Sequence, residues 1–200
     1  MMASLIALGA RFLTGARARW LGCAPEGKLR VYFANHTSNL DFVLLWSALP
    51  RALRERTRPV GARDYWEGGG IREYLAARVF RAVLIERKRV TRGNNPLGPM
   101  VDALGAGDSL IIFPEGTRSP SGEVGEFKAG LYHLAREVRH AEFVPVFIEN
   151  LNRVLPKGEV LPVPMLCSLN FGTPLHLGEG ETKPEFLARA RAAMLTMRPL

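Results

Sequence analysis

A histidine and an aspartate five positions apart are the side chains of this sequence best suited to acid–base chemistry. They are His36 and Asp41, the second and last residues of the stretch Asn-His-Thr-Ser-Asn-Leu-Asp at 35–41. A neutral imidazole can remove a proton near pH 7. A carboxylate bonded to its other ring nitrogen fixes the tautomer and stabilises the imidazolium that forms. The pair therefore predicts a general base with its orienting partner.

The spacing limits how these two side chains can meet. On one continuous helix, five residues turn about 500° and leave the side chains roughly 140° apart. If His36 lies in a turn and Asp41 in the first helical turn after it, the carboxylate can reach back to the ring. Ser38 or Thr37 would then be the N-cap, and Ser38-x-x-Asp41 is a variant of the capping box. The same residues fit an ordinary turn whose aspartate complements the helix dipole, so a structural interpretation stays open.

The flanking residues predict the elements that position this pair. An apolar, β-prone run at 29–34 precedes it, and a helical run at 42–49 follows. Farther along, strand-like and helical segments alternate, which predicts a single layered α/β domain with a central mixed or parallel sheet flanked by helices. Pro145 suggests that its strand is an edge strand or carries a bulge. The expected strands are 59–62, 82–85, 109–113, 143–148 and 165–171, and the expected helices are 71–80, 97–104, 127–139 and one that starts at 182–185.

Polar residues follow two of these expected strands. The strand at 109–113 ends in Pro-Glu-Gly-Thr-Arg-Ser at 114–119, and the strand at 82–85 ends in Glu-Arg-Lys-Arg. In an open α/β sheet, ligands bind beyond the carboxyl ends of the strands. Arg118 would project from such an end to bind an anion, or would pair with Glu115 within the turn. Lys128, farther along the chain, could add positive charge near the same end, although we favour a position on the surface.

Together these blocks resemble the glycerolipid acyltransferases of lysophosphatidic acid acyltransferase (PlsC) type. Residues 35–41 match the family's N-H-x4-D block, and residues 113–119 are similar to its F-P-E-G-T-R-S block at every position. Residues 84–87 resemble the block that ends in a phosphate-binding arginine, and residues 144–148 look like the late V-P-V block. The resemblance implies a glycerol-3-phosphate acyltransferase-like α/β fold. It also implies transfer of a fatty acyl group from acyl-CoA or acyl-carrier-protein thioester to the hydroxyl of a lysophospholipid.

The resemblance also implies an acceptor and a role for individual residues. The expected acceptor is 1-acyl-sn-glycerol-3-phosphate, which would give phosphatidic acid. An alcohol can attack a thioester without a protein nucleophile, so we expect no acyl-enzyme. We expect no cofactor beyond the acyl-CoA or acyl carrier protein co-substrate, and no metal, because the two cysteines and four histidines lack ligand spacing. The catalytic residues would be His36 and Asp41, and the substrate-binding residues Arg87, Glu115, Gly116, Thr117 and Arg118.

The charge and the N-terminal residues predict contact with a membrane surface. Lys and Arg number 27 against 19 Asp and Glu, a net charge of +8 that favours anionic partners. The uncharged run at 1–10 is shorter than the roughly 20 residues that span a bilayer. We expect residues 1–22 to form an amphipathic helix on an anionic membrane, ahead of an acyltransferase domain at 23–200. The protein would then lie at the cytoplasmic face, peripheral or shallowly anchored. Alternatively, or in addition, the helix packs its Leu and Phe face on the domain.

The sequence also leaves other functions open. The acceptor could be another lysolipid, such as a lyso-aminolipid, or glycerol-3-phosphate. A lipase-like hydrolase could use Ser38 or Ser47 with His36, although the sequence has no G-x-S-x-G elbow. A non-enzymatic protein that binds a membrane surface would also explain the charge. No nucleic-acid-binding motif is present, so we predict no nucleic-acid partner.

Overall fold

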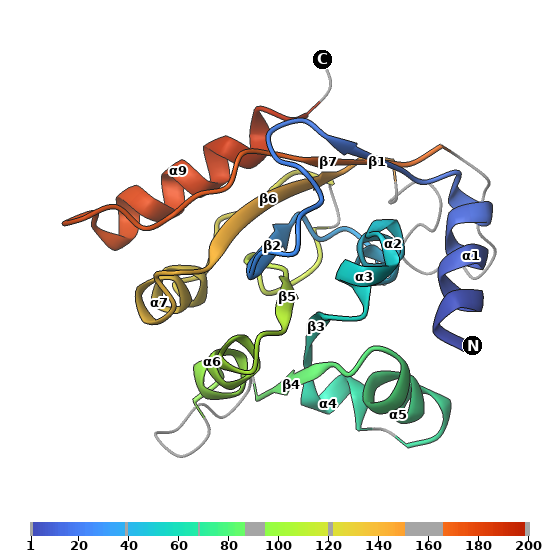
Figure 1. Ribbon diagram of the computed structural model, residues 1–200. Helices are drawn as coiled ribbons and strands as arrows, with labels where there is room; N and C mark the ends of the chain where they lie inside the picture. Colours follow the sequence, from blue (N-terminus) through green and yellow to red (C-terminus); the bar gives the residue numbers. More distant parts are fainter. Residues whose placement is uncertain are drawn as a thin grey trace.

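The computed structural model describes residues 2–38, 40–67, 69–86, 95–119, 122–150 and 166–198 (Figure 1). These residues form one seven-stranded sheet in the order β1-β7-β6-β2-β5-β3-β4. Neighbouring strands are parallel except for the antiparallel pair β6 and β7. The predicted α/β fold with a mixed, mostly parallel sheet is confirmed. The strands are β1 (Arg17–Trp20), β2 (Arg30–Ala34), β3 (Thr57–Ala62), β4 (Val83–Ile85), β5 (Ser109–Ile112), β6 (Glu142–Ile148) and β7 (Ser168–Phe171).

Helices cover both faces of this sheet (Figure 1). Helices α6 (Leu97–Gly105), α7 (Gly130–Glu137) and α9 (Lys183–Leu195) pack on one face, while α1 (Met2–Thr14) and α2 (Asp41–Ala48) pack on the other. Alternate residues of a strand point to opposite faces. The central strand β2 is therefore buried at every position. The short helices are α3 (Arg51–Arg54), α4 (Arg63–Trp66) and α5 (Ile71–Tyr74), which continues into the π-helical turn η1 (Leu75–Val79).

The N-terminal helix is present but shorter than predicted. It ends at Thr14, and the residues after it form β1, which pairs in parallel with β7 at the edge of the sheet. The helix predicted to reach residue 22 is therefore wrong over residues 17–20, and a domain boundary at 22 would cut the sheet. Helix α1 packs inward through Ala7, while Leu5, Leu8 and Phe12 are 61%, 68% and 87% exposed. The alternative that its Leu and Phe face packs on the domain is wrong.

Strand β6 corrects the interpretation of Pro145. The strand lies between β7 and β2, so it is not an edge strand. On its β7 side, Val146 is opposite Phe171 whereas Phe143 is opposite Leu175. Between these two pairs, β6 advances by three residues (143 to 146) while the partner segment advances by four (171 to 175). The partner segment therefore carries one extra residue, as in a β-bulge. Pro145 lies within this interruption, where a proline can be accommodated in a sheet.

Candidate active site

Two neighbouring parallel strands bring the predicted site residues to one edge of the sheet. Strand β2 leads into His36, and β5 leads into the turn at 113–119. Because the two strands run in the same direction, their carboxyl ends meet at the same edge. Helix α2 begins there with Asp41 as its first residue. The fold therefore gathers the two strongest sequence blocks, although about 80 positions separate them in the chain.

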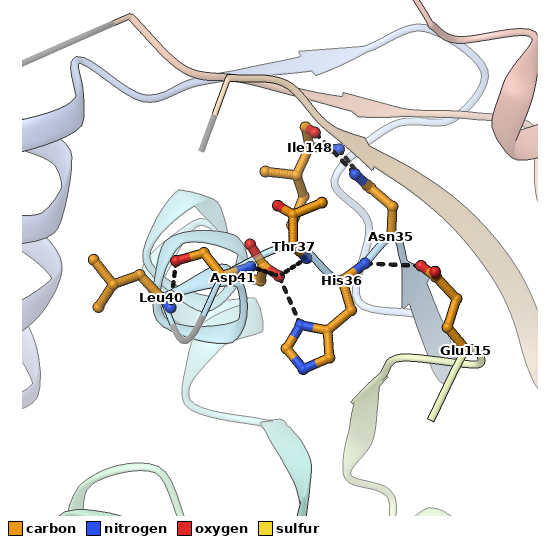
Figure 2. Close-up of polar contacts among 8 residues, drawn as sticks. Asn35, His36, Thr37, Leu40, Asp41, Glu115 and Ile148 are labelled. Atoms are coloured by element: carbon orange, nitrogen blue, oxygen red, sulfur yellow. Dashed lines mark hydrogen bonds and ion pairs between the residues drawn. The ribbon is translucent and has the colours of Figure 1, made fainter. Parts of the chain in front are cut away.

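His36 and Asp41 are in direct contact (Figure 2). The Nδ1 atom of His36 lies 2.7 Å from Oδ2 of Asp41. The same oxygen accepts hydrogen bonds from the backbone N–H groups of Thr37 (2.6 Å) and Ser38 (2.9 Å). A carboxylate can only accept, so the imidazole proton lies on Nδ1 and the lone pair on Nε2. No described residue bonds to Nε2, and the His36 side chain is 22% exposed, so this nitrogen can accept a proton.

The turn that holds this pair differs from a capping box. The N-cap of α2 is Leu40, which makes no side-chain cap bond. The hydroxyl of Ser38 accepts from the N–H of Leu40 at 3.3 Å. The Asp41 carboxylate supplies the backward half of the box by binding the Ser38 N–H. Asp41 thus closes the turn and also orients the histidine, so the geometry fits both interpretations left open by the sequence, and the catalytic one stays a prediction.

Three further contacts fix the backbone and the ring of His36. The Asn35 side chain donates to the carbonyl of Ile148 at 3.0 Å and accepts from its N–H at 2.7 Å, which ties the turn to β6 (Figure 2). The N–H of Ser119 donates to the carbonyl of His36 at 2.8 Å. The ring of Phe113 stacks on the imidazole with centroids 4.2 Å apart. Sequence reasoning gave Asn35 no role, although a polar residue at the end of a buried strand was the available signal.

Glu115 lies behind the site rather than in it. It is only 5% exposed. One carboxylate oxygen accepts the backbone N–H of His36 at 2.9 Å (Figure 2), and the other accepts that of Gly125 at 2.9 Å. A Cβ at Gly125 would lie 3.1 Å from this carboxylate, so glycine permits the close approach. This placement differs from the predicted contact with substrate, because both oxygens bind the backbone.

A cavity of about 640 Å³ opens beside the pair. Its lining includes His36 together with three of the predicted substrate-binding residues, Gly116, Thr117 and Arg118. Gly116 has φ +71°, in the left-handed region that favours glycine. Arg87 lies outside the described residues. The structure therefore places four predicted residues in one cavity, with Asp41 and Glu115 supporting it from behind.

The cavity wall has two chemical characters. One part carries the cations Arg118 and Lys128, with the His133 ring alongside them. Sequence reasoning gave His133 no role and favoured the surface for Lys128, which is exposed yet also lines the cavity. Within the described ranges, no group of three or more His, Cys, Asp or Glu is arranged to hold a metal ion. The other part of the wall is apolar and includes Phe42, Trp66, Leu97, Met100 and Ile112.

Comparisons with known proteins agree with this arrangement. The family model described as Acyltransferase matches residues 19–149. The chain is 29% identical over 202 residues to the 1-acyl-sn-glycerol-3-phosphate acyltransferase alpha of Mus musculus, which covers 96% of this chain and 67% of that protein. It is 31% identical over 153 residues to the 1-acyl-sn-glycerol-3-phosphate acyltransferase of Limnanthes alba, covering 72% of this chain and 50% of that one.

A solved structure shares the fold. It is the crystal structure of the 1-acyl-sn-glycerophosphate acyltransferase PlsC from Thermotoga maritima, with a TM-score of 0.73 and 22% identity. The similarity covers 98% of this chain and 76% of the Thermotoga chain. At this identity, the likeness supports the architecture of the chain.

Proposed function

This chain belongs to the acyltransferase family, and from that premise we propose that it transfers a fatty acyl group to 1-acyl-sn-glycerol-3-phosphate, giving phosphatidic acid. The names of the mouse and Limnanthes relatives support this acceptor. The observation that carries the proposal is the contact of 2.7 Å between His36 and Asp41 beside a cavity that also holds Arg118. A base and an anion-binding group in one cavity are what a phosphorylated alcohol requires.

In the proposed mechanism, Nε2 of His36 takes the proton of the acceptor hydroxyl as its oxygen attacks the thioester carbonyl carbon. Asp41 holds Nδ1–H and stabilises the imidazolium. When the tetrahedral intermediate collapses, the C–S bond breaks and the imidazolium returns the proton to the departing thiolate. Base catalysis of this kind contributes about 10²- to 10⁴-fold. His133 lines the same cavity, but within the described part of the chain no carboxylate pairs with its ring, so His36 is the better candidate.

The residues of the 113–119 turn would bind the acceptor. Arg118, half-buried in the cavity wall, can hold a phosphate through charge-assisted hydrogen bonds. Thr117 adds a hydroxyl, and Gly116 lets the acceptor approach the backbone. Arg87 would add a second guanidinium, a role that rests on the family resemblance. The apolar part of the cavity would take an acyl chain.

The donor would be an acyl-CoA or an acyl carrier protein. Both are acidic, and the net charge of +8 suits either one. The chemistry above needs no resident cofactor or metal.

The exposed face of α1 supports a peripheral position on an anionic membrane, which we propose to be at its cytoplasmic face. Leu5, Leu8 and Phe12 follow the i, i+3, i+7 spacing of one helix face and point away from the core. Arg11 on the same helix is exposed and can contact lipid phosphates. None of the helices that the structure describes is long and apolar enough to span a bilayer. The lipid-soluble acceptor would then be available where the enzyme binds.

The described lining of the cavity contains neither of the two serines on which the hydrolase alternative depends. Ser38 and Ser47 are both buried, and neither lines the cavity next to His36. The family assignment likewise disfavours a purely non-enzymatic membrane protein.

Product analysis tests the proposal directly. The purified protein is mixed with labelled acyl-CoA or acyl carrier protein and each candidate acceptor, namely lysophosphatidate, glycerol-3-phosphate and a lyso-aminolipid. Mass spectrometry should show phosphatidic acid, formed only when lysophosphatidate is present. Free fatty acid released equally with and without acceptor would indicate a hydrolase. Acylation of another acceptor alone would overturn the proposed substrate.

A further inference from the structure

Lys128 is a cation in the cavity to which the mechanism above assigns no role. Its backbone N–H donates to the carbonyl of Pro114 at 2.8 Å, which anchors it to the turn that carries Arg118. A Cβ built on Gly116 would lie 3.5 Å from Cγ of Lys128 and 3.9 Å from Cε. The lysine side chain therefore runs alongside Gly116. Lys128 and Arg118 thus belong to one small structure, although ten residues separate them.

Neither of these cations is neutralised by a neighbour within the described ranges. Other arginines of the protein have carboxylate partners, such as Arg30 with Glu142 at 2.9 Å. No described carboxylate lies within ion-pair distance of Lys128 or Arg118. The nearby Glu115 instead accepts two backbone N–H groups. Arg118 on the turn and Lys128 anchored to it, both without a described carboxylate partner, make a positive field that favours a bound anion.

The acidic residue among the described cavity lining lies on another part of the sheet. It is Glu86, which directly follows β4. Strand β4 is separated by β3 from β5, the strand that leads into the Arg118 turn. Among the described lining residues, the acidic side chain therefore lies two strands away from the turn that carries Arg118, while the buried Glu115 carboxylate lies behind that turn.

The covalent structures of the substrates identify which phosphate this turn can bind. In the proposed acceptor, the reacting oxygen and the phosphorus are joined through O–C–C–O–P, which spans roughly 5 Å. In the donor, the nearest phosphate lies beyond the whole pantetheine arm, several times farther from the thioester. The turn is close to the base, because Glu115 binds the His36 N–H at 2.9 Å and Gly116 is the next residue. An anion on this turn therefore fits the acceptor.

We propose that Lys128 and Arg118 form a two-cation site for the acceptor's phosphate, in which Lys128 selects phosphomonoesters over phosphodiesters. This inference rests on the proposed function. A phosphomonoester has three unsubstituted oxygens and a charge near −2 at pH 7, whereas a phosphodiester has two such oxygens and a charge of −1. The Arg118 fork can bind two oxygens, and the compact Lys128 ammonium can bind the third. A lysophosphodiester leaves the lysine without that partner.

Steady-state kinetics of Lys128→Met test this selection. Lysophosphatidate and a lysophosphodiester such as lysophosphatidylethanolamine are compared as acceptors. The variant should raise KM for lysophosphatidate about tenfold or more, the effect of losing one charge-assisted hydrogen bond. It should change KM for the donor and for the lysophosphodiester less than twofold. Lys128→Arg should recover most of the affinity, because it keeps the charge. Lys183→Met, an exposed lysine at the start of α9 and outside the cavity, is the matched control and should leave every constant unchanged.

Several results would overturn the inference. An unchanged KM for lysophosphatidate in Lys128→Met would exclude the contact. An equal rise in donor KM would place Lys128 on a donor phosphate, and an equal rise for the lysophosphodiester would remove its selectivity. If Lys128→Met unfolds, Lys128→Gln replaces it, with thermal melting as the check. Wild-type protein that fails to acylate lysophosphatidate would defeat the proposed function itself, whereas normal wild-type activity with an unaffected variant defeats only this inference.

Discussion

At the scale of single residues, the site depends on side chains that bind the backbone as much as on those that face the cavity. One oxygen of Asp41 accepts hydrogen bonds from the imidazole Nδ1–H and from two backbone N–H groups. Its other oxygen has no hydrogen-bond partner in the part of the chain that the structure describes. Glu115 uses both oxygens to join the backbones of His36 and Gly125. The positions of both carboxylates therefore determine where the His36 ring lies.

We expect Glu115→Gln to act on turnover rather than on acceptor binding. The glutamine amide can accept a hydrogen bond from only one of the two backbone N–H groups, of His36 and Gly125. Its NH₂ group would face the other N–H, donor against donor. The loss of a hydrogen bond to a charged group, about 1.5 to 3 kcal/mol, would lower kcat about 10- to 100-fold by displacing His36. Acceptor KM should change less than threefold in initial-rate assays. A large rise in acceptor KM at normal kcat would instead support the substrate contact that the sequence suggested.

The residue scale also shows what sequence can predict of such a site. The contact between His36 and Asp41 was predictable because five residues and a turn decide it. The role of Glu115 was not predictable, because its partner His36 is 79 positions away in the chain. His36 donates its backbone N–H to this carboxylate, and a backbone group leaves no signal in the sequence. Lys128 was placed on the surface for the same reason, since only the fold brings it against Gly116.

At the scale of elements, β2 and β6 carry a charged brace at the end opposite the candidate site. Arg30 begins β2 and Glu142 begins β6, and their side chains meet at 2.9 Å. Arg30 is almost fully buried, so its charge depends on this partner. Although partial burial opposes it, the hydrogen bonds from Arg30 and Lys28 lower the pKa of Glu142 below its ordinary value. The brace thus links the two central strands that lead to the site.

We expect Glu142→Gln to lower the free energy of unfolding by about 2 kcal/mol at pH 7, because it weakens the partner of a buried charge. A carboxylate with a lowered folded-state pKa stabilises fully above its unfolded pKa, about 4.3 for glutamate, and loses this effect as the pH falls through the folded pKa. The difference between the variant and wild type should therefore shrink below about pH 4. Urea titrations at pH 7 and pH 3.5 measure it. Equal stabilities at pH 7, or the same difference at both pH values, would contradict the expectation.

The strands differ in how well the sequence predicted them. Apolar runs predicted β2, β5 and β6 because these strands are buried on both faces. Strand β1 was missed because Arg-Ala-Arg-Trp at 17–20 is a half-exposed edge strand without an apolar run. The proline of β6 suggested an edge strand or a bulge, and the sequence could not decide between them, because the irregularity that accommodates the proline depends on Leu175 of a distant segment.

At the scale of the whole molecule, exposed apolar residues concentrate on α1. This surface and the net charge of +8 would direct the protein to an anionic bilayer. The acceptor and the product of the proposed reaction are both lipids. The strength of binding to that surface would therefore determine how often an acceptor molecule reaches the cavity.

We expect the double variant Leu8→Ser and Phe12→Ser to weaken binding to vesicles that contain anionic phospholipid by about tenfold or more. The variant lacks the two apolar side chains that would be buried among the lipid acyl chains. Vesicle co-sedimentation measures the affinity. Ile71→Ser removes a comparably exposed apolar residue from α5 and serves as the matched control. Equal losses in both proteins would show that exposure alone matters, and an unchanged affinity of the double variant would argue against contact through α1.

The central claim is that His36, oriented by Asp41, is the base that activates the acceptor. The two histidines of the cavity provide the most direct measurement, because only one of them has a carboxylate partner among the described residues. The turnover numbers of His36→Gln and His133→Gln are compared at saturating donor and acceptor. We expect His36→Gln to lose about 10²- to 10⁴-fold in kcat, while His133→Gln stays within a few fold of wild type. Near-normal turnover by His36→Gln, or a larger loss in His133→Gln, would contradict it.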